Sequence, residues 1–418
     1  MDVKFRRWLW VAVFLVAVFS ISVTARVSTA RAQSAKPVTL TVDLPDRPAV
    51  GATLFEEKSC ARCHSIGGEG KGGVGPDLGR IVFFGDVLDL GGSFWNHAPV
   101  MRQKMAALKI MSPTLTADQT ANLIAYLTAF RYYDTQVREA GNPALGSMVF
   151  VKKGCAACHA PEPERKAEGP DLKKYRGRYA PIVFTQALWN HSPAMTKAMQ
   201  GKGMPQPAFT GREMTDLAAY LQVGLAPGAP DPVVFEPGSP KRGRELFVSK
   251  ACVTCHAIAG QGGTGGPDLG TRGRAMARSV PEIAGVMWNH SQQMTAEFAR
   301  RDIARPTFSG QEMADVIAYL YFVNYANVRG TPFRGGQIFS AKCAACHTLG
   351  NSAIGPDLLT AKDLDQPIGI IASMWNHAAA MESQSSRRGR AWPRLERGET
   401  ADLAAYLISR RAEATKQP

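Results

Sequence analysis

Apolar residues recur at helical spacing in stretches that stand at regular intervals along the chain. From Met214 to Leu221, and again from Met313 to Leu320, apolar side chains lie three and four positions apart, which predicts amphipathic helices. The alternation of apolar and polar residues that marks a half-buried strand is not evident in any stretch. The pattern therefore predicts an all-α fold.

The same order of features occurs four times, with a period of about 95 residues. Each copy opens with a short helical stretch from a glycine to a phenylalanine, followed by Cys-x-x-Cys-His and a glycine-rich loop that reaches Gly-Pro-Asp-Leu. A middle helix then runs into Trp-Asn-His, and a last helix closes the copy. The opening stretches are Gly51–Phe55, Gly146–Phe150, Gly243–Phe247 and Gly336–Phe339. A period of this length suits four tandem domains better than a solenoid.

The expected domains cover residues 45–135, 143–223, 239–326 and 333–412. Joints rich in helix-breaking residues separate them, at Glu139–Ala144, Gly224–Pro240 and Asn327–Pro332. The second joint is the longest and the richest in proline. We therefore expect the chain to divide there into two pairs of neighbouring repeats.

Residues 1–32 form a predicted secretory signal. Three basic residues lie within the first seven, an apolar run of 16 residues follows at Trp8–Val23, and Ala30-Arg31-Ala32 supplies a small-x-small cleavage pattern. The run is shorter than the roughly 20 residues of a spanning helix, which favours cleavage over an N-terminal membrane anchor. We therefore expect a periplasmic or otherwise exported protein.

All eight cysteines fall in four identical Cys-x-x-Cys-His frames. These are Cys60/Cys63/His64, Cys155/Cys158/His159, Cys252/Cys255/His256 and Cys343/Cys346/His347. Disulfides explain paired cysteines in an exported chain, and structural zinc explains C-x-x-C units, but neither requires a histidine directly after each pair. Covalent haem does, because two thiols bond the vinyl groups and the next residue reaches the iron as proximal ligand. The sequence therefore predicts four haem c groups.

With these motifs in the same order in every copy, each repeat resembles a class I cytochrome c domain, over residues of about 45–412. The resemblance implies that the first and last helices of each domain cross, with glycine allowing close approach and aromatic residues packing over it, as at Gly51 and Tyr126. It also implies that the proline of Gly-Pro-Asp-Leu accepts the Nδ1 proton of the proximal histidine. The prolines at that position are Pro76, Pro170, Pro267 and Pro356.

The distal ligand of the iron has two sets of candidates, which recur together in Trp-Asn-His-x-x-x-Met. The favoured methionines are Met101, Met195, Met294 and Met381, and the alternative histidines are His97, His191, His290 and His377. On a helix, residues four apart share a face, so both could point at the haem. These histidines and the proximal ones are the only eight in the chain. The step of five from asparagine to methionine matches the Asn-Gly-x-x-x-Met run of photosynthetic class I cytochromes.

Other residues near this motif allow further expectations. Class I domains usually take the distal methionine from a loop ahead of the last helix, and Met204 fits that place, but Ile110, Ile303 and Arg390 stand there in the other repeats. Pro99 and Pro193 predict a kink or a new helical start. For Trp95, Trp189, Trp288 and Trp375, core packing and an indole bond to a haem propionate are equal alternatives.

The predicted function is outer-sphere electron transfer between redox proteins, because six-coordinate irons leave no position for a substrate. One alternative is a haem enzyme, peroxidase-like or acting on another small molecule, in which one haem is open. The fourth repeat is the unusual copy, because its step from Phe339 to Cys343 is shortened. Another alternative is a subunit of a membrane oxidoreductase. In four-haem reaction-centre subunits the distal methionines precede Cys-x-x-Cys-His, which disfavours that family.

The charge of the chain indicates the kind of partner. The formal net charge is +14, and loss of residues 1–32 removes five positive charges and one negative, leaving +10. Nucleic acid is not expected outside the cytoplasm. The positive charge therefore predicts an acidic redox protein as partner. Five arginines around Trp392-Pro393 could form a docking patch or a plain solvated loop; they are Arg387, Arg388, Arg390, Arg394 and Arg397.

Overall fold

The computed structural model describes residues 36–416, except residues 41, 43, 46, 67–72, 80–84, 139–140, 160–167, 173–180, 223–236, 271–278, 327 and 352–353. Two compact units are present. One contains residues up to Val42, Gly85–Ala117 and Val328–Pro418, and the other contains Asp43–Phe84 and Asp118–Asn327. The predicted signal at 1–32 and most of the joint Gly224–Pro240 lie outside the described residues.

The described residues are mostly helical, which confirms the predicted all-α class. The opening helices of the four repeats are α2 (Pro48–Glu57), α5 (Pro143–Lys152), α9 (Pro240–Ser249) and α12 (Pro332–Lys342). The last helices are α4 (Ala117–Arg138), α8 (Glu213–Gln222), α11 (Gly310–Ala326) and α14 (Glu399–Ala414). Short strands pair antiparallel, β1 (Val38–Leu40) with β4 (Val328–Gly330) and β2 (Ala257–Ile258) with β3 (Gln261–Gly262).

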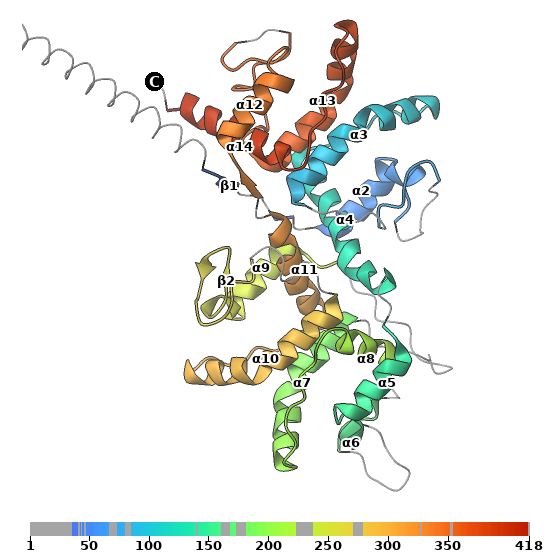
Figure 1. Ribbon diagram of the computed structural model, residues 1–418, viewed down its shortest axis with the longest axis vertical. Helices are drawn as coiled ribbons and strands as arrows, with labels where there is room; N and C mark the ends of the chain where they lie inside the picture. The colour runs from blue at the N-terminus through green and yellow to red at the C-terminus, as the bar shows by residue number, and fades with distance from the viewer. Residues whose placement is uncertain are drawn as a thin grey trace, which may run out of the picture. The chain divides into compact units, whose positions relative to one another are not determined.

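In every repeat the opening helix crosses the last helix at a glycine, as the resemblance implied (Figure 1). A Cβ on Gly146 would collide with the backbone oxygen of Asp216 and with Cβ of Tyr220. One turn further on, the Phe150 and Tyr220 rings pack with centroids 5.6 Å apart. The crossing thus needs a residue without a side chain, and the aromatic pair closes it.

In the fourth repeat the expected crossing glycine, Gly336, is wrong by one residue. A Cβ on Gly335 would meet the backbone oxygen of Asp402 and Cβ of Tyr406, whereas the atoms nearest to a Cβ on Gly336 are those of the Tyr406 ring, at 3.2 Å or more. Gly335 also restores the step of four to Phe339 that the other repeats have. The sequence Gly-Gly allowed either residue, and only the position of the opposing helix distinguishes them.

The shortened step before Cys343 removes a left-handed residue. Ser59, Gly154 and Ala251 directly precede the first cysteine of their motifs, with φ of 63°, 79° and 60°. In the fourth repeat α12 instead continues to Lys342, and the Cys343 N–H donates to the Phe339 oxygen at 2.8 Å. The motif therefore still follows the opening helix directly.

Each middle helix has 21 residues and runs through the whole Trp-Asn-His-x-x-x-Met segment. These helices are α3 (Val87–Ala107), α7 (Pro181–Gly201), α10 (Val280–Arg300) and α13 (Pro367–Arg387). Pro99 and Pro193 lie inside α3 and α7, so the expected new helical start is wrong. The carbonyl four residues before each proline is used by another group: Trp95 O accepts from the Trp392 indole at 3.2 Å, and Trp189 O accepts from Arg305 at 2.8 Å.

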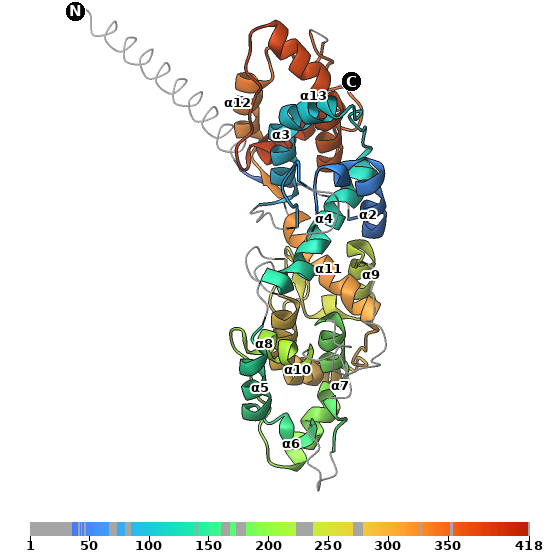
Figure 2. The same cartoon turned by 90° about the vertical axis from the view of Figure 1, so that its right-hand side faces the viewer.

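Within each unit two middle helices pack together, α7 with α10 and α3 with α13 (Figures 1 and 2). Trp189 Nε1 donates to Pro306 O at 2.8 Å, and the Asn190 amide exchanges two hydrogen bonds with the Phe308 backbone. Trp288 Nε1 donates to Pro207 O at 2.7 Å in return. We call these reciprocal contacts the Trp-Asn clamp.

Within the other unit the same clamp joins residues 85–117 of the first repeat to the fourth repeat. Trp95 Nε1 donates to Pro393 O at 2.6 Å and Trp375 Nε1 to Pro113 O at 2.7 Å. Asn376 exchanges hydrogen bonds with the Leu115 backbone at 2.8 and 2.9 Å. The expected pairing of neighbouring repeats is therefore wrong, because the clamps join the second repeat to the third and the first to the fourth.

Candidate haem sites

The four Cys-x-x-Cys-His motifs share two backbone hydrogen bonds. In each, the histidine N–H donates to the oxygen of the first cysteine, at 2.9 Å for His64, His159 and His256 and 3.0 Å for His347. This helical turn places the imidazole one turn after the first thiol. Burial raises the pKa of the first thiol of each pair, Cys60, Cys155, Cys252 and Cys343, to about 11. These thiols face apolar surroundings.

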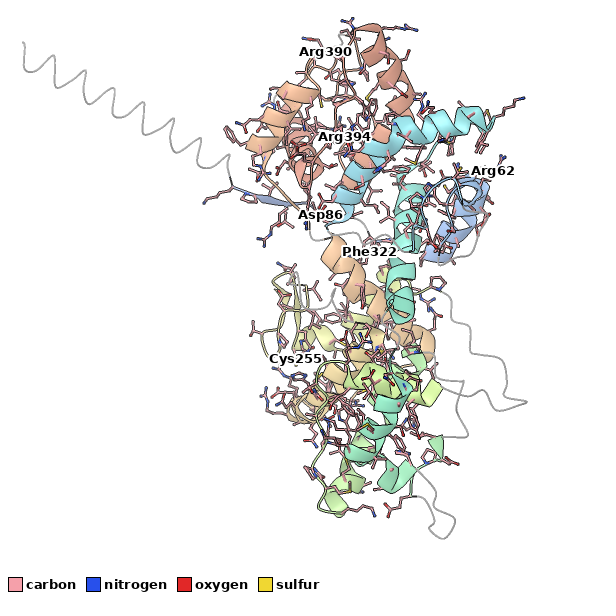
Figure 3. All side chains as sticks on the ribbon, turned by 45° about the vertical axis from the view of Figure 1, so that its right-hand side comes forward. Arg62, Asp86, Cys255, Phe322, Arg390 and Arg394 are labelled. Carbon is pink, nitrogen blue, oxygen red and sulfur yellow. The ribbon has the colours of Figure 1, made fainter. Side chains whose placement is uncertain are left out.

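The second cysteine of each pair lies on the same turn and is half-buried. Its N–H donates to the oxygen of the first cysteine at 3.0–3.2 Å. These second cysteines are Cys63, Cys158, Cys255 and Cys346, of which Figure 3 labels Cys255. All eight cysteines lie in the described part of the chain, and every thiol is free, so none of the pairs is closed as a disulfide. Both thiols of each motif are thus placed for the predicted thioether bonds, and their bonding to haem stays a prediction.

The Gly-Pro-Asp-Leu loop fixes the proximal imidazole, as predicted. The carbonyl oxygens of Pro76, Pro170 and Pro267 lie 2.9–3.0 Å from Nδ1 of their histidines, and that of Pro356 lies 3.3 Å away. The glycine before each proline donates its N–H to the oxygen of the second cysteine at 2.8–3.0 Å. A Cβ on Gly169 would lie 2.6 Å from the His159 ring, so the loop packs flat against the imidazole. With Nδ1 bonded, Nε2 is the ring nitrogen left for a metal.

The middle helix ends beside the loop that holds the proximal histidine. In the second repeat Lys202, directly after α7, pairs with Glu168 at 2.7 Å, and Glu168 precedes Gly169 and Pro170. In the third repeat a Cβ on Gly265 would lie 3.3 Å from the Arg301 guanidinium, which directly follows α10. The second half of each of these helices therefore extends from the clamp to its own repeat's Cys-x-x-Cys-His motif.

Methionine and histidine of the distal motif lie in different surroundings. Met195 and Met199 pack, with Cys155, on an apolar cluster that also includes Ala284 and Trp288 of the third repeat. Met294 and Phe298 pack on a second cluster, whereas Cys252 packs on a different one. Met101 and Met381 are half-buried. By contrast, all four histidines are exposed, and Nδ1 of each contacts a carbonyl oxygen one turn back in its own helix, at 2.6–2.9 Å. These histidines are His97, His191, His290 and His377.

Met204 lies beside its own motif but outside the helix. Its methyl carbon would lie 2.9 Å from a Cβ on Gly154, the residue before Cys155. Its N–H donates to Met199 O at 2.9 Å, and Ile110, Ile303 and Arg390 make the same backbone bond in their repeats. The position thus ends the middle helix in all four copies, whatever side chain it carries.

The tryptophans do not bind propionates through their indole N–H. Trp95, Trp189, Trp288 and Trp375 are at most 9% exposed, and each indole donates to a proline carbonyl of the paired repeat. Core packing was the correct alternative, with a directed hydrogen bond added.

The sequence did not predict which segment receives the hydrogen bonds of the clamp tryptophan and asparagine. The receiving segment is Pro-x-Leu or Pro-x-Phe ahead of each last helix: Pro113–Leu115, Pro207–Phe209, Pro306–Phe308 and Pro393–Leu395. A lysine near the first cysteine holds this segment from within its own repeat, as Lys153 does by donating to Ala208 O at 2.6 Å. Lys250 and Lys342 do the same. The recurrence of Pro-x-Leu/Phe was visible in the sequence, but its bonding to another repeat was not.

The five arginines around Trp392-Pro393 are exposed, and Arg390 and Arg394 are labelled in Figure 3. Trp392 itself is stacked on Trp95 at a centroid distance of 4.0 Å. The aromatic residue of the predicted docking patch is therefore half-buried against the clamp, whereas the five arginines are exposed.

Thiols, imidazole and loop together fit covalent haem. In every repeat two cysteines stand one helical turn apart and an imidazole is oriented through Nδ1. In the second repeat Cys155 and Met195 pack on the same apolar cluster. Soft thioether and imidazole ligands are those that haem iron takes in c-type cytochromes. A separate observation concerns membranes. None of the helices in the described part of the chain has both the length and the hydrophobicity of a membrane-spanning segment.

Comparison with known proteins agrees with this chemistry. The family model described as Cytochrome c matches residues 48–130, 143–223, 240–322 and 333–410. Cytochrome c6 of Porphyra purpurea is 37% identical over 79 residues, which are 18% of this chain and 67% of the relative. Cytochrome c6 of Pyropia tenera is 37% identical over 79 residues, 18% of this chain and 87% of the relative. No solved structure gave a significant match.

Proposed function

Because this chain belongs to the cytochrome c family, we propose that it carries four covalent haem c groups, one on each Cys-x-x-Cys-His motif. The family and the cytochrome c6 relatives make it a haem electron-transfer protein. Each haem, when bound, supplies a one-electron couple whose potential depends on its axial ligands and surroundings. The observation that carries the proposal is the fourfold geometry that presents two thiols and one oriented imidazole together.

The chain's own residues have distinct tasks at each site. The proposed anchors are Cys60 with Cys63, Cys155 with Cys158, Cys252 with Cys255 and Cys343 with Cys346. The proximal histidines His64, His159, His256 and His347 present Nε2 to the iron. The proline carbonyls hold the proton on Nδ1, which fixes the tautomer and strengthens the ligand. The crossed opening and last helices supply the apolar wall, and in the second and third repeats the middle helix, which ends beside the proximal loop, excludes water from the other side.

We propose methionine as the distal ligand: Met101, Met195, Met294 and Met381. The packing of Met195 on the same apolar cluster as Cys155 supports the methionine, and the exposure of His191 on the same helix disfavours the histidine. Near-infrared magnetic circular dichroism of the oxidised protein distinguishes the two ligand sets. In Met195→Ala one haem in four should lose the spectral signature of histidine–methionine ligation. His191→Ala should leave the signatures of all four haems unchanged. The opposite result would assign the ligand to histidine.

Electron carriage is proposed over catalysis because a methionine stands in the same place in every repeat, the fourth included. Rapid binding of cyanide to one ferric haem of the parent protein would instead indicate an open site and a haem enzyme. Spectra that do not respond to cyanide support the carrier.

The proposed setting is the periplasm or another exported compartment, with acidic redox proteins or a membrane oxidoreductase as partners. The predicted signal and the net charge of +10 that remains after loss of residues 1–32 support this proposal. Screening weakens attraction between exposed charges, so transfer rates to an acidic partner should fall with salt. Reversing the charges of Arg388 and Arg390 should reduce both the rate and its salt dependence. Unchanged kinetics would remove the patch from the proposal.

A further inference from the structure

We infer that Arg305 makes the two haem sites of the second and third repeats unequal, so that an electron settles on the second. This inference rests on the proposed function. The two repeats are joined by the Trp-Asn clamp with the same contacts in both directions. A symmetrical pair gives no direction to an electron, so a residue that breaks the symmetry decides which site is reduced first.

The two repeats differ at the residue before the proline whose carbonyl accepts the indole hydrogen bond, Pro207 or Pro306. In the third repeat it is Arg305, whose Nη2 donates to Trp189 O at 2.8 Å and to Ser192 Oγ at 2.9 Å. In the second repeat it is Gln206, whose amide donates to Trp288 O at 2.9 Å and Ser291 Oγ at 3.2 Å. The two side chains thus bind equivalent atoms on α7 and α10, and only one of them is charged.

Arg305 is held in place by three features of the second repeat. Pro193 leaves Trp189 O without its usual helical donor, and the arginine supplies one. The guanidinium carbon also lies 3.9 Å from the centre of the Trp189 ring, a cation–π distance. Ser192 Oγ completes the contact. The positive charge is therefore fixed on α7, which belongs to the other repeat.

The charge is poorly compensated. Within the described part of the chain no carboxylate pairs with Arg305, and its Nε is buried without a hydrogen-bond partner. Burial lowers the pKa of the guanidinium to about 10, so it remains charged at neutral pH. The charges at the ends of the middle helices are more exposed, for example Arg300 at 64%, and are screened by solvent.

The charge lies close to the proposed distal ligand of the second haem. Ser192 precedes Met195 by three residues, about 4.5 Å along the helix axis. A fixed positive charge stabilises the reduced state of a nearby redox centre more than the oxidised state, because reduction adds a negative charge. The second site should therefore have the higher midpoint potential, and the third, opposite neutral Gln206, the lower one.

The test is a spectroelectrochemical titration of the full four-haem protein. Arg305→Gln, which copies the residue of the second repeat, should lower one midpoint potential and leave the other three in place. Gln206→Arg, made alone, should raise a different midpoint. The matched control is Arg300→Gln, which removes the same charge from an exposed position and should shift the midpoints less.

Two outcomes would overturn the inference: Arg305→Gln moving no midpoint further than Arg300→Gln does, or moving one upward. Arg305→Lys covers the case in which Arg305→Gln fails to fold, since it keeps the charge and should keep the parent midpoint. A parent protein that binds no haem would contradict the proposed function instead. Counting haems in the parent before titration keeps the two failures apart.

Discussion

The indole N–H of Trp288 donates to the carbonyl oxygen of Pro207 at 2.7 Å, across 81 residues of sequence. Trp288 belongs to the middle helix of the third repeat and Pro207 to the segment ahead of the last helix of the second. Trp288 is the first residue of the distal motif of the third repeat, and Pro207 lies twelve residues after Met195, the last residue of the distal motif of the second. Between the second and third repeats, the Trp-Asn clamp therefore fixes each middle helix at the point from which it extends toward its own Cys-x-x-Cys-His motif, and the paired repeat helps to shape each of these two sites.

Loss of the clamp amide should destabilise the protein. Asn190 both donates to and accepts from the Phe308 backbone, at 2.8 and 3.0 Å, so Asn190→Ala leaves two backbone groups without partners. We expect the free energy of unfolding to fall by about 2 kcal/mol. Gln200→Ala, at an exposed position of the same helix, should change it by less than about 0.5 kcal/mol. Denaturant unfolding of both variants checks this, and equal small losses would show that the clamp contributes little.

The helix crossing should not tolerate a methyl group. Gly146→Ala places a Cβ against Asp216 O and Tyr220, and we expect about 3 kcal/mol of destabilisation, at the upper end for overpacking. Gly201→Ala is the control, because nothing lies within 4 Å of its added Cβ. That variant should be as stable as the parent or slightly more stable. Thermal unfolding measures both variants. Equal unfolding temperatures for Gly146→Ala and Gly201→Ala would contradict the close crossing at Gly146.

The loop glycine should be needed for the proximal ligand. In Gly169→Ala the new Cβ would lie 2.6 Å from the His159 ring, which must then move or rotate. We expect altered axial ligation in one haem of four while the others keep their spectra. Electron paramagnetic resonance of the oxidised protein resolves this. An unaltered set of four signals would mean that the loop shifts to accommodate the methyl group while the imidazole keeps its position.

A buried aspartate should make stability depend on pH. The Asp315 side chain is 0% exposed, and burial raises its pKa even though it accepts from Ser239 N at 2.8 Å. A raised carboxyl pKa means that the folded state holds the proton more tightly than the unfolded state, whose value is about 3.9. Stability is therefore lost as pH rises from about 4 through the raised pKa.

Asparagine at this position removes that loss. The first repeat already has Asn122 in the equivalent place, where it accepts from Arg47 N at 3.3 Å. Asp315→Asn should be more stable than the parent at pH 7 and equal to it near pH 3, as measured by denaturant unfolding across that range. If the variant were weaker at pH 7, the ion pair with Arg242 would outweigh the burial of the carboxylate.

The sequence predicted those features that depend on neighbours in the chain. The proline carbonyls lie nine to twelve residues after their histidines, and their hydrogen bonds are present in all four copies. The helix crossings were implied by the resemblance to class I cytochrome c domains, at glycines such as Gly146, four residues before Phe150. In the fourth repeat Gly335 and Gly336 are both small, and only the opposing Asp402 distinguishes them.

The features that were missed join residues far apart in sequence. Asn96 bonds Leu395 across 299 positions, and Asn190 bonds Phe308 across 118. No local pattern of apolar residues encodes which repeat a tryptophan will face, since all four tryptophans stand in the same motif. The same reason explains Arg305, whose role depends on Trp189 and Pro193 of another repeat.

The intact mass of the matured, exported protein decides whether the four motifs hold covalent haem. With thioether bonds to every cysteine pair, the mass should equal that of the polypeptide plus four haems and should survive denaturation and extraction with acid and organic solvent. A denatured chain that shows the mass of the bare polypeptide, or that loses its colour to the solvent, would contradict the assignment of the Cys-x-x-Cys-His motifs.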